Sequence, residues 1–244
     1  MQKNNQTTKD TFNLAIQNHK KNNLQTAKNL YKKIIKANPD FEAAHNNLGN
    51  VLRDLGENQK AKSCYKKAIQ INPNYANAHY NLGSLLDDLG EHQKSINCYE
   101  KTIQIQPNYA NAHYNLGLIF KELGEHQKAI NCYEKAIQIN PNFSDSYNNL
   151  GLIFFELGEH QKAINCYEKV IQMEPNNLTS HWLSMNTFPI IYKNLKEIDL
   201  YRKRFEDRIK KINHLLDTQS KYTKKQIVDA MKSSTNFYLS YQGR

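Results

Sequence analysis

Apolar residues recur along the middle of the chain at spacings of three and four, in pairs of segments separated by a glycine. In residues 110–143 the first segment carries Ala112, Leu116, Ile119, Phe120 and Leu123, and the second carries Ala129, Ile130, Tyr133, Ala136, Ile137 and Ile139. This spacing indicates two amphipathic helices. We expect Asn108 to cap the first helix, Gly124 to end it in a left-handed conformation and Pro141 to end the second.

The same unit is repeated with a period of 34 residues. Prolines recur at Pro39, Pro73, Pro107, Pro141 and Pro175, and the string LGEHQK recurs at 89–94, 123–128 and 157–162. Two sets of glycines keep the same spacing: Gly49, Gly83, Gly117 and Gly151, and Gly56, Gly90, Gly124 and Gly158. Chance does not hold one period across so many residue types, so the pattern predicts a stack of helical pairs.

The units resemble tetratricopeptide repeats. In the first helix the family places a leucine before a small residue, here Leu14-Ala15, Leu48-Gly49, Leu82-Gly83, Leu116-Gly117 and Leu150-Gly151. In the second helix a small residue precedes an aromatic one by four positions, here Ala27/Tyr31, Ala61/Tyr65, Ser95/Tyr99, Ala129/Tyr133 and Ala163/Tyr167. The resemblance implies an all-α solenoid, a right-handed superhelix of helix-turn-helix repeats with a helical C-terminal extension.

These patterns divide the chain into five parts. They are a lead-in at 1–7, five repeats at 8–41, 42–75, 76–109, 110–143 and 144–177, a capping helix and connection at 178–194, a basic helical linker at 195–234, and a strand-like segment at 235–244. We expect the last segment to begin a domain that is missing from this sequence. The first repeat lacks the glycine that ends the first helix in the others, which is typical of a terminal repeat.

The linker contains a long amphipathic helix at 195–216. Its expected apolar face carries Leu195, Ile198, Tyr201, Phe205, Ile209, Ile212 and Leu216. Its expected basic face carries Arg202, Lys203, Arg204, Arg208, Lys210 and Lys211. This basic face is either solvated or a contact surface, and the sequence leaves both open. We expect Trp182, the only tryptophan, to pack in the capping helix.

The distribution of charge along the chain does not indicate a further function. The net charge of +10 is made of +7 in residues 1–36, −4 in 37–177 and +7 in 178–244. A nucleic-acid-binding protein concentrates its positive charge along one functional face, whereas here it flanks an acidic middle. We therefore do not expect a nucleic acid as the partner. There is no run of apolar residues long enough to span a membrane, and none that resembles a signal peptide.

Asparagine occupies the sixth position of every repeat: Asn13, Asn47, Asn81, Asn115 and Asn149. The family resemblance places this position on the concave groove, together with Tyr80 and Tyr114 at position 5. A primary amide can both donate and accept hydrogen bonds, so it can hold a peptide backbone without reading side chains. The motif AHYNLG at 78–83 and 112–117 resembles the repeats of O-linked N-acetylglucosamine transferases, and in such enzymes an asparagine ladder holds the substrate polypeptide.

Two alternatives stay open for these asparagines. They hold an extended peptide of roughly a dozen residues, or they bond between neighbouring helices and only fix the stacking. Acidic groove positions would favour basic or hydroxyl-rich peptide segments; they are Asp87, Asp88, Glu122 and Glu156. The carboxylate clamp of chaperone adaptors is not present, because position 6 is never basic and Lys9 is the only basic residue at position 2.

The remaining chemical candidates recur at the repeat period and are interpreted as structural. Zinc ligands normally come in closely spaced pairs, whereas the cysteines lie 34 residues apart, at Cys64, Cys98, Cys132 and Cys166. We interpret them as packing residues of a reducing compartment. We expect one set of histidines to be packed (His45, His79 and His113) and another to cap the turn between helices (His92, His126 and His160). We expect no cofactor, no metal and no catalytic residue in this chain.

The region after the repeats carries a second resemblance. Residues 188–212 and 235–244 resemble the junction of bacterial SPINDLY-type transferases, where a repeat array leads into a nucleotide-sugar glycosyltransferase. The leading hypothesis is therefore a cytoplasmic protein-interaction array that presents extended polypeptide to such an enzyme. The alternative is a free-standing scaffold without an enzymatic role. The sequence leaves open whether Arg244 is a natural end.

Overall fold

The computed structural model describes residues 2–187 and 195–218, and within these ranges it contains twelve helices and no strand. The residue bounds are α1 Gln2–Lys20, α2 Leu24–Ala37, α3 Glu42–Asp54, α4 Asn58–Ile71, α5 Ala76–Asp88, α6 His92–Ile105, α7 Ala110–Glu122, α8 His126–Ile139, α9 Ser144–Glu156, α10 His160–Met173, α11 Leu178–Asn186 and α12 Leu195–Thr218. These bounds confirm the expected all-α fold. Helix α1 begins before residue 8, where we expected the first repeat to start.

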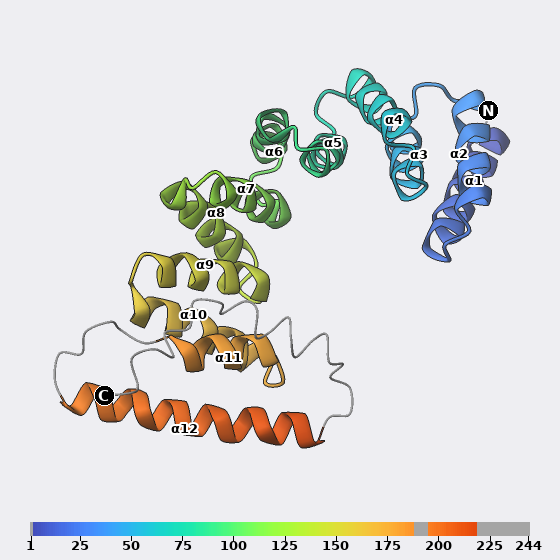
Figure 1. The fold of residues 1–244 in the computed structure, drawn as a ribbon. Coiled ribbons are helices and arrows are strands. Elements are labelled where there is room, and N and C mark those ends of the chain that lie inside the picture. Colours follow the sequence, from blue (N-terminus) through green and yellow to red (C-terminus); the bar gives the residue numbers. More distant parts are fainter. Residues whose placement is uncertain (1, 188–194, 219–244) are drawn as a thin grey trace. The chain divides into compact units, whose positions relative to one another are not determined.

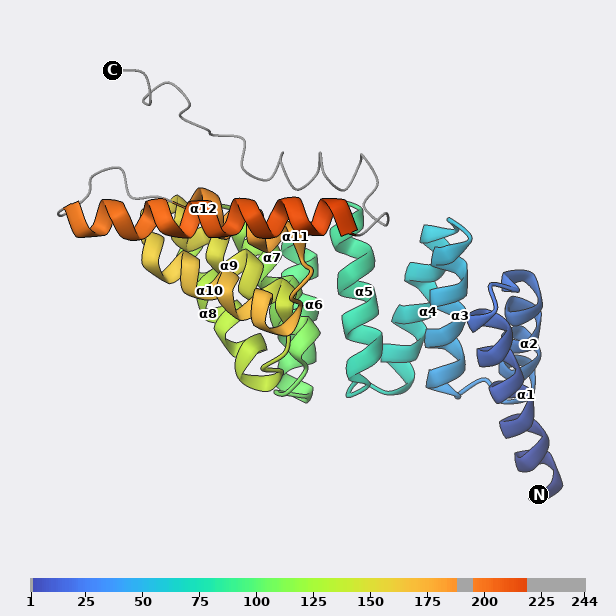
Figure 2. The same cartoon turned by 90° about the horizontal axis from the view of Figure 1, so that it is seen from below.

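The chain divides into two compact units, Met1–Leu123 and Gly124–Arg244. The first contains α1 to α7 and the second α8 to α12 (Figure 1). Within each unit, helices that follow one another in the chain pack side by side, as Figure 2 shows for α3 and α4. In the first unit α3 also contacts α5, and α5 contacts α7. The first helices of neighbouring repeats therefore present a shared face there.

The turn between the two helices of a repeat requires a left-handed residue. Gly56, Gly90 and Gly158 have φ angles of +75°, +73° and +76°, in a region that costs a side chain energy but costs glycine nothing. The first repeat has Asn22 at this place, with a φ of +61°. Asparagine tolerates this conformation better than most residues. The divergent first repeat therefore keeps the geometry of the turn without the glycine.

The core of each repeat pairs a tyrosine with a small residue. The tyrosines Tyr31, Tyr65, Tyr99, Tyr133 and Tyr167 are fully buried, as are Ala27, Ala61, Ser95, Ala129 and Ala163. Burial of such aromatic rings dominates the packing energy of a small helical pair. The expected small-then-aromatic pattern is therefore the observed core.

The expected cap at Asn108 is wrong. Helix α7 begins at Ala110, its N-cap residue is Tyr109, and no side chain caps it. Tyr109 instead packs its ring on Tyr80 and donates its hydroxyl to Asn77 Oδ1 at 3.2 Å. The residue before α7 thus contacts the preceding helix α5, and no side chain caps α7.

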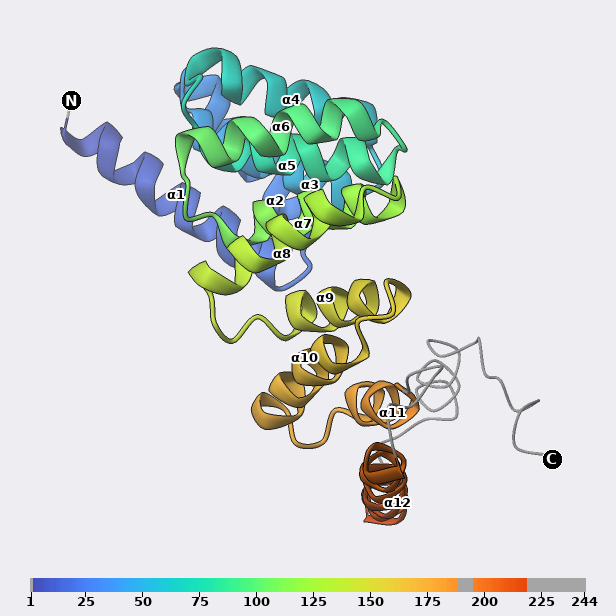
Figure 3. The same ribbon diagram turned by 90° about the vertical axis from the view of Figure 1, so that its left-hand side faces the viewer.

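In the second unit α11 covers α10, and α12 packs along α11 (Figure 3). The capping helix was expected, and Trp182 packs there with Phe205 against Leu178, Met185 and Ile212. Asn177 caps α11 by accepting a hydrogen bond from the Ser180 amide at 2.9 Å. The remaining C-terminal predictions, for 188–194, 219–234 and the strand-like 235–244, lie outside the described residues.

The expected division of α12 into an apolar and a basic face is partly wrong. Leu195 is 78% exposed, whereas Leu215 is buried, as are Tyr201 and Ile212. Two residues assigned to the basic face turn inward. Arg204 donates to the Thr187 carbonyl oxygen, and Arg208 forms an ion pair with Glu168 of α10. Arginine can pack its aliphatic stem and keep its guanidinium bonded, so charge alone misassigned these two residues, whereas Tyr201, Phe205 and Ile212 of the expected apolar face do pack against the protein.

Candidate functional site

The predicted peptide-binding residues lie on the first helices of the repeats. Asn13 lies on α1 and is exposed, while Asn47 on α3, Asn81 on α5 and Asn115 on α7 are half-buried. Tyr80 and Tyr114, on α5 and α7, are also half-buried. The first unit therefore carries all of the predicted set except Asn149, which is half-buried on α9 of the second unit.

A chain of amides links the second and third repeats. Asn81 donates from Nδ2 to Asn46 Oδ1 at 2.9 Å, and Asn46 donates in turn to Asn47 Oδ1 at 3.1 Å. Asn46 is 3% exposed. A buried amide is costly unless it is hydrogen-bonded, so this chain holds Asn81 in place while it joins α3 to α5.

Asn115 makes the corresponding bonds one repeat later. Its Nδ2 lies 3.2 Å from the hydroxyl oxygen of Tyr80 and 3.1 Å from that of Tyr99. These two contacts match the two N–H groups of a primary amide, which leaves the carbonyl oxygen of Asn115 as the group available to a ligand. Because Tyr80 belongs to α5, this amide also joins neighbouring first helices.

Tyr80 sits in an aromatic cluster beside these amides. Its ring stacks on Tyr109, with centroids 4.9 Å apart and planes 27° apart, and it lies 5.7 Å from Tyr99. Burial raises the pKa of Tyr80, offset in part by the hydrogen bond from Asn115, and raises the pKa of Tyr109 to about 12. These hydroxyls are therefore neutral at physiological pH and serve as hydrogen-bonding groups on a rigid aromatic surface.

Asn149 and position 5 of the first repeat make contacts of a different kind. Asn149 donates to the Asp145 carbonyl oxygen of its own helix at 3.0 Å. Position 5 of the first repeat is Phe12, whose ring packs against Phe41 at 4.9 Å and Tyr31 at 5.8 Å. The phenyl ring of Phe12 cannot accept from Asn47 the kind of hydrogen bond that Asn46 accepts from Asn81. The inter-repeat bond thus depends on which residue stands at position 5.

The sequence placed Asn46 at a groove position without giving it a role, and it did not indicate Tyr109 as part of this surface. The signal for Asn46 was present in the sequence, because both inter-repeat bonds join residues 35 apart, from position 5 of one repeat to position 6 of the next. Such a pairing becomes visible only when the rotation between neighbouring repeats is known.

Two of the acidic positions expected along the groove are paired with other side chains in the first unit. Asp88 forms an ion pair with Arg53 at 2.5 Å, and Asp87 lies 3.1 Å from His92 Nδ1. Glu122 is exposed at the end of α7. The acidic character of this rim is therefore weaker than a count of carboxylates suggests.

The packed histidines share one hydrogen bond. His45, His79 and His181 place Nε2 at 2.8, 2.9 and 2.9 Å from the carbonyl oxygen of the proline six residues before each of them. A carbonyl only accepts, so Nε2 carries the proton. The bond ties the start of each first helix to the chain before it, which confirms a packing role. His92, which we expected to lie in the turn, is instead the first residue of α6, and its Nδ1 lies 3.1 Å from Asp87 Oδ1 of α5.

The four cysteines are free thiols. Cys64 and Cys98 are half-buried and Cys166 is buried, and burial raises the pKa of these thiols to about 11, 11 and 12. Reactive cysteines need a lowered pKa, so these three behave as packing residues. Among the described residues there is no group of three or more metal-ligating side chains. The same part of the chain has no helix long and apolar enough to cross a membrane.

Comparison with protein families identifies the repeat. Family models described as tetratricopeptide repeat match residues 30–63, 110–143 and 144–177, and a model described as TPR repeat matches 49–90 and 85–124. Together these matches cover 30–177, which is more than half of the chain. No match was found among curated proteins.

Solved structures show the same fold. MamA is 32% identical with a TM-score of 0.60, and the match covers 66% of this chain and 94% of MamA. PilF of Pseudomonas aeruginosa is 18% identical with a TM-score of 0.73, and the match covers 92% of this chain and 98% of PilF. YrrB, described as a TPR protein with an unusual peptide-binding site, is 18% identical with a TM-score of 0.60, covering 83% and 97%. The chain belongs to the tetratricopeptide-repeat family, whose arrays are protein-interaction modules.

Proposed function

We propose that the face shared by α3, α5 and α7 binds an extended polypeptide segment through Asn81, Asn115 and the tyrosines beside them. The observation that carries this proposal is the hydrogen-bonded arrangement of half-buried amides on successive first helices. Preorganised polar groups next to an aromatic surface are typical of peptide recognition, because little conformational freedom is lost on binding. YrrB shows that a peptide-binding site occurs on this fold.

The amides retain the capacity to bind a backbone. Asn81 donates one of its two N–H groups to Asn46, so its second N–H and its carbonyl oxygen can bond a peptide group. Asn115 offers its carbonyl oxygen to a peptide N–H. The role in stacking and the role in binding therefore combine, since the bonds that join the helices also fix the direction of the groups that remain.

The spacing of the ladder suits an extended chain. Neighbouring helices pack about 8–10 Å apart, and an extended peptide advances about 3.3 Å per residue. Successive asparagines would therefore meet every third residue of the peptide. A ligand bound through Asn47, Asn81 and Asn115 would span about seven to ten residues.

The first prediction tests the ladder with the double variant Asn81→Ala/Asn115→Ala. The probe is a fluorescein-labelled dodecapeptide rich in Ser, Thr and Lys, with fluorescence anisotropy as the measurement. We expect affinity to fall about tenfold, which corresponds to about 1.4 kcal/mol, because two backbone hydrogen bonds are lost. The matched control is Asn97→Ala/Asn131→Ala, which removes two exposed asparagines from second helices.

The double variant also leaves the buried hydroxyl of Tyr99 without its bond from Asn115. We therefore expect a lower melting temperature with unchanged helix content, measured by circular dichroism at the temperature of the binding assay. A scrambled peptide of the same composition should bind equally well, because the ladder contacts the backbone. Unaltered affinity in a folded double variant would overturn the proposal.

The link to a glycosyltransferase is a finer hypothesis than the comparisons support. It rests on the resemblance of the repeats and of residues 188–212 and 235–244 to SPINDLY-type enzymes, and the reported family models and solved structures give it no support. The matches cover 94% of MamA, 98% of PilF and 97% of YrrB. The match thus extends over almost the whole of each solved chain, which favours the alternative of a free-standing scaffold.

The mass of the native gene product separates these two functions. An antibody against the repeats would detect the product in an immunoblot. A product larger by several hundred residues, with binding of a nucleotide sugar, would support the transferase arm. A product near the mass of the 244-residue chain would support the scaffold. The peptide-binding proposal stands or falls independently of this result.

A further inference from the structure

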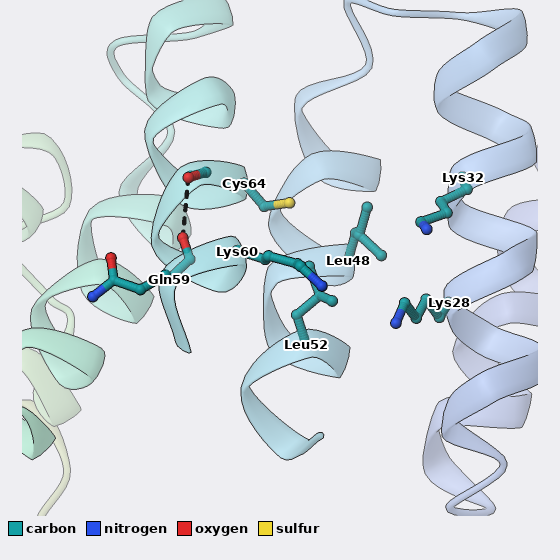
Figure 4. A pocket seen from close by; sticks show the side chains of 8 residues that line it. Lys28, Lys32, Leu48, Leu52, Gln59, Lys60 and Cys64 are labelled. Carbon is teal, nitrogen blue, oxygen red and sulfur yellow. Dashed lines mark hydrogen bonds between the residues drawn. The ribbon is translucent and has the colours of Figure 1, made fainter. Parts of the chain in front are cut away.

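A second surface of the first unit has the character of a binding site and uses none of the ladder side chains. A cavity of about 440 Å³ lies between α2 and the helix pair α3–α4, where the first repeat meets the second (Figure 4). Lys28 and Lys32 line it from α2, Leu48 and Leu52 from α3, and Lys60 and Cys64 from α4.

The floor of this cavity is apolar. Leu48 and Leu52 are 6% and 3% exposed and belong to the core of the first unit, and Cys64 packs against the same core. Burial raises the pKa of the Cys64 thiol to about 11, so the sulfur is uncharged at physiological pH. A ligand that fills the cavity must therefore supply an apolar group.

The rim of the cavity carries an excess of positive charge. Lys28 and Lys60 share a single carboxylate, that of Glu57, with both Nζ–Oε distances at 2.5 Å. Lys32 is exposed and lies near Cys64, where its charge offsets part of the rise that burial causes in the thiol pKa. The rim thus carries three lysines, and two of them share the one carboxylate of Glu57. Each ammonium has three N–H donors, so Lys28 and Lys60 retain donors for a further anion.

This basic rim belongs to the first repeats and is not a general property of the fold. The residue equivalent to Lys32 in the second repeat is Lys66. In the other three repeats it is a glutamate, namely Glu100, Glu134 and Glu168. The residue equivalent to Lys28 in the second repeat is Lys62. In the later repeats it is an isoleucine, namely Ile96, Ile130 and Ile164. Lys66 also lies near Cys98, as Lys32 lies near Cys64. The folding of the repeat therefore does not require lysine at these positions.

We propose that the groove between α2 and α3–α4 binds an acidic peptide segment, with an apolar side chain in contact with Leu48, Leu52 and Cys64 and a carboxylate paired with Lys32. Charge complementarity selects an acidic partner. The leucine floor favours a peptide over a nucleic acid, because a polyanion gains from phosphate contacts and gains nothing from an apolar pocket.

The test uses the full 244-residue chain and a fluorescein-labelled nonapeptide of Asp and Glu with one central Leu, measured by fluorescence anisotropy. The decisive variant is Lys32→Glu, which introduces the residue that the later repeats carry at this place. The matched control is Lys33→Glu, an exposed neighbour on α2 that does not line the cavity. We expect Lys32→Glu to weaken binding about tenfold and Lys33→Glu less than about twofold.

Further measurements test the apolar floor of the cavity, the class of ligand and the independence of this site from the ladder. Replacing the central Leu of the peptide by Ser should weaken binding about tenfold, because the apolar contact is lost. A twelve-nucleotide oligothymidylate should bind more weakly than the peptide. The ladder variant Asn81→Ala/Asn115→Ala should bind the acidic nonapeptide with unchanged affinity, which separates this site from the proposed groove on the first helices.

Four outcomes would overturn the proposal. They are equal losses in Lys32→Glu and Lys33→Glu, equal affinity for the Leu and Ser peptides, oligothymidylate binding at least as tight as the peptide, and no binding of the nonapeptide by the unaltered chain at millimolar concentration. The first and third would indicate diffuse charge attraction, and the second would exclude the leucine floor.

Discussion

At the scale of single residues, the room left for a side chain at one glycine position differs between repeats. A Cβ atom added at Gly49 would lie 2.5 Å from Cε1 of Tyr65, whereas one added at Gly83 would lie 3.1 Å from Cys98 and Tyr99. The first distance is a clash with a fully buried ring, and the second is a contact that small shifts can relieve. The same sequence position therefore differs in tolerance between adjacent repeats.

This difference makes a prediction for the pair Gly49→Ala and Gly83→Ala. We expect Gly49→Ala to lower the free energy of unfolding by about 1–3 kcal/mol, the usual cost of overpacking a core. We expect Gly83→Ala to cost less. Urea unfolding followed by circular dichroism measures both, and equal losses would show that Tyr65 moves aside as readily as Tyr99.

Single residues also show which contacts the sequence pattern predicted and which it did not. The buried tyrosines and their small partners followed from the helical spacing and from the family resemblance, because each pair lies four positions apart on one helix. The partners of Asn81 and Asn115 did not follow, because they lie on other helices. Phe12, Asn46 and Tyr80 occupy one repeat position yet make different contacts. Position within a repeat therefore does not determine the contact.

At the scale of elements, α12 shows what periodicity leaves undecided. Apolar residues at spacings of three and four predict a helix whichever side faces the protein. The side that packs contains Tyr201, Ile212 and Leu215 together with Arg204 and Arg208. The two arginines were assigned to a basic surface because charge was taken as a mark of exposure. Their hydrogen-bond partners on α10 and after α11 reverse that assignment.

The docking of α12 through Arg208 gives an element-scale prediction. Glu168 of α10 accepts from Arg208 and from Ser184 Oγ, the latter at 3.2 Å. Replacing it by alanine leaves a half-buried guanidinium without its counter-charge, so we expect a loss of about 1–3 kcal/mol. Faster amide hydrogen exchange in 195–215 should accompany it, as measured by mass spectrometry.

The control for this variant is Glu134→Ala, the corresponding exposed residue of α8. We expect it to leave exchange in α12 unchanged. If Glu168→Ala left the exchange of 195–215 as slow as in the unaltered chain, the ion pair would not hold α12 in place.

At the scale of the whole molecule, titratable groups set the range of pH in which the chain is stable. Lysine hydrogen bonds lower the pKa of Glu57 and Glu91 to about 2, and burial lowers the pKa of His181. A lowered pKa means that the folded state disfavours protonation, so stability is lost as pH falls. Burial raises the pKa of Tyr65 and Tyr99, and stability is then lost as pH rises above about 10.

We therefore expect the free energy of unfolding to be highest between about pH 6.5 and 10. It should begin to fall below about pH 6.5, where the unfolded histidine gains a proton, and fall further below about pH 4.5. Urea unfolding at a series of pH values measures this profile. The variant Glu57→Gln/Glu91→Gln should flatten the limb below pH 4.5 and leave the alkaline limb unchanged. An unchanged acid limb would show that these carboxylates do not contribute to it.

The sequence by itself determined the period, the helices, the turns and the core of each repeat. These features depend on interactions within about one helical turn or on one residue's backbone preference, so they can be read along the chain. Only the tertiary structure decided which amides and hydroxyls pair between repeats, that Arg204 and Arg208 of α12 turn inward and where Lys28, Lys32 and Lys60 surround a leucine floor. Those features depend on the rotation and separation of helices far apart in sequence, which local spacing does not contain.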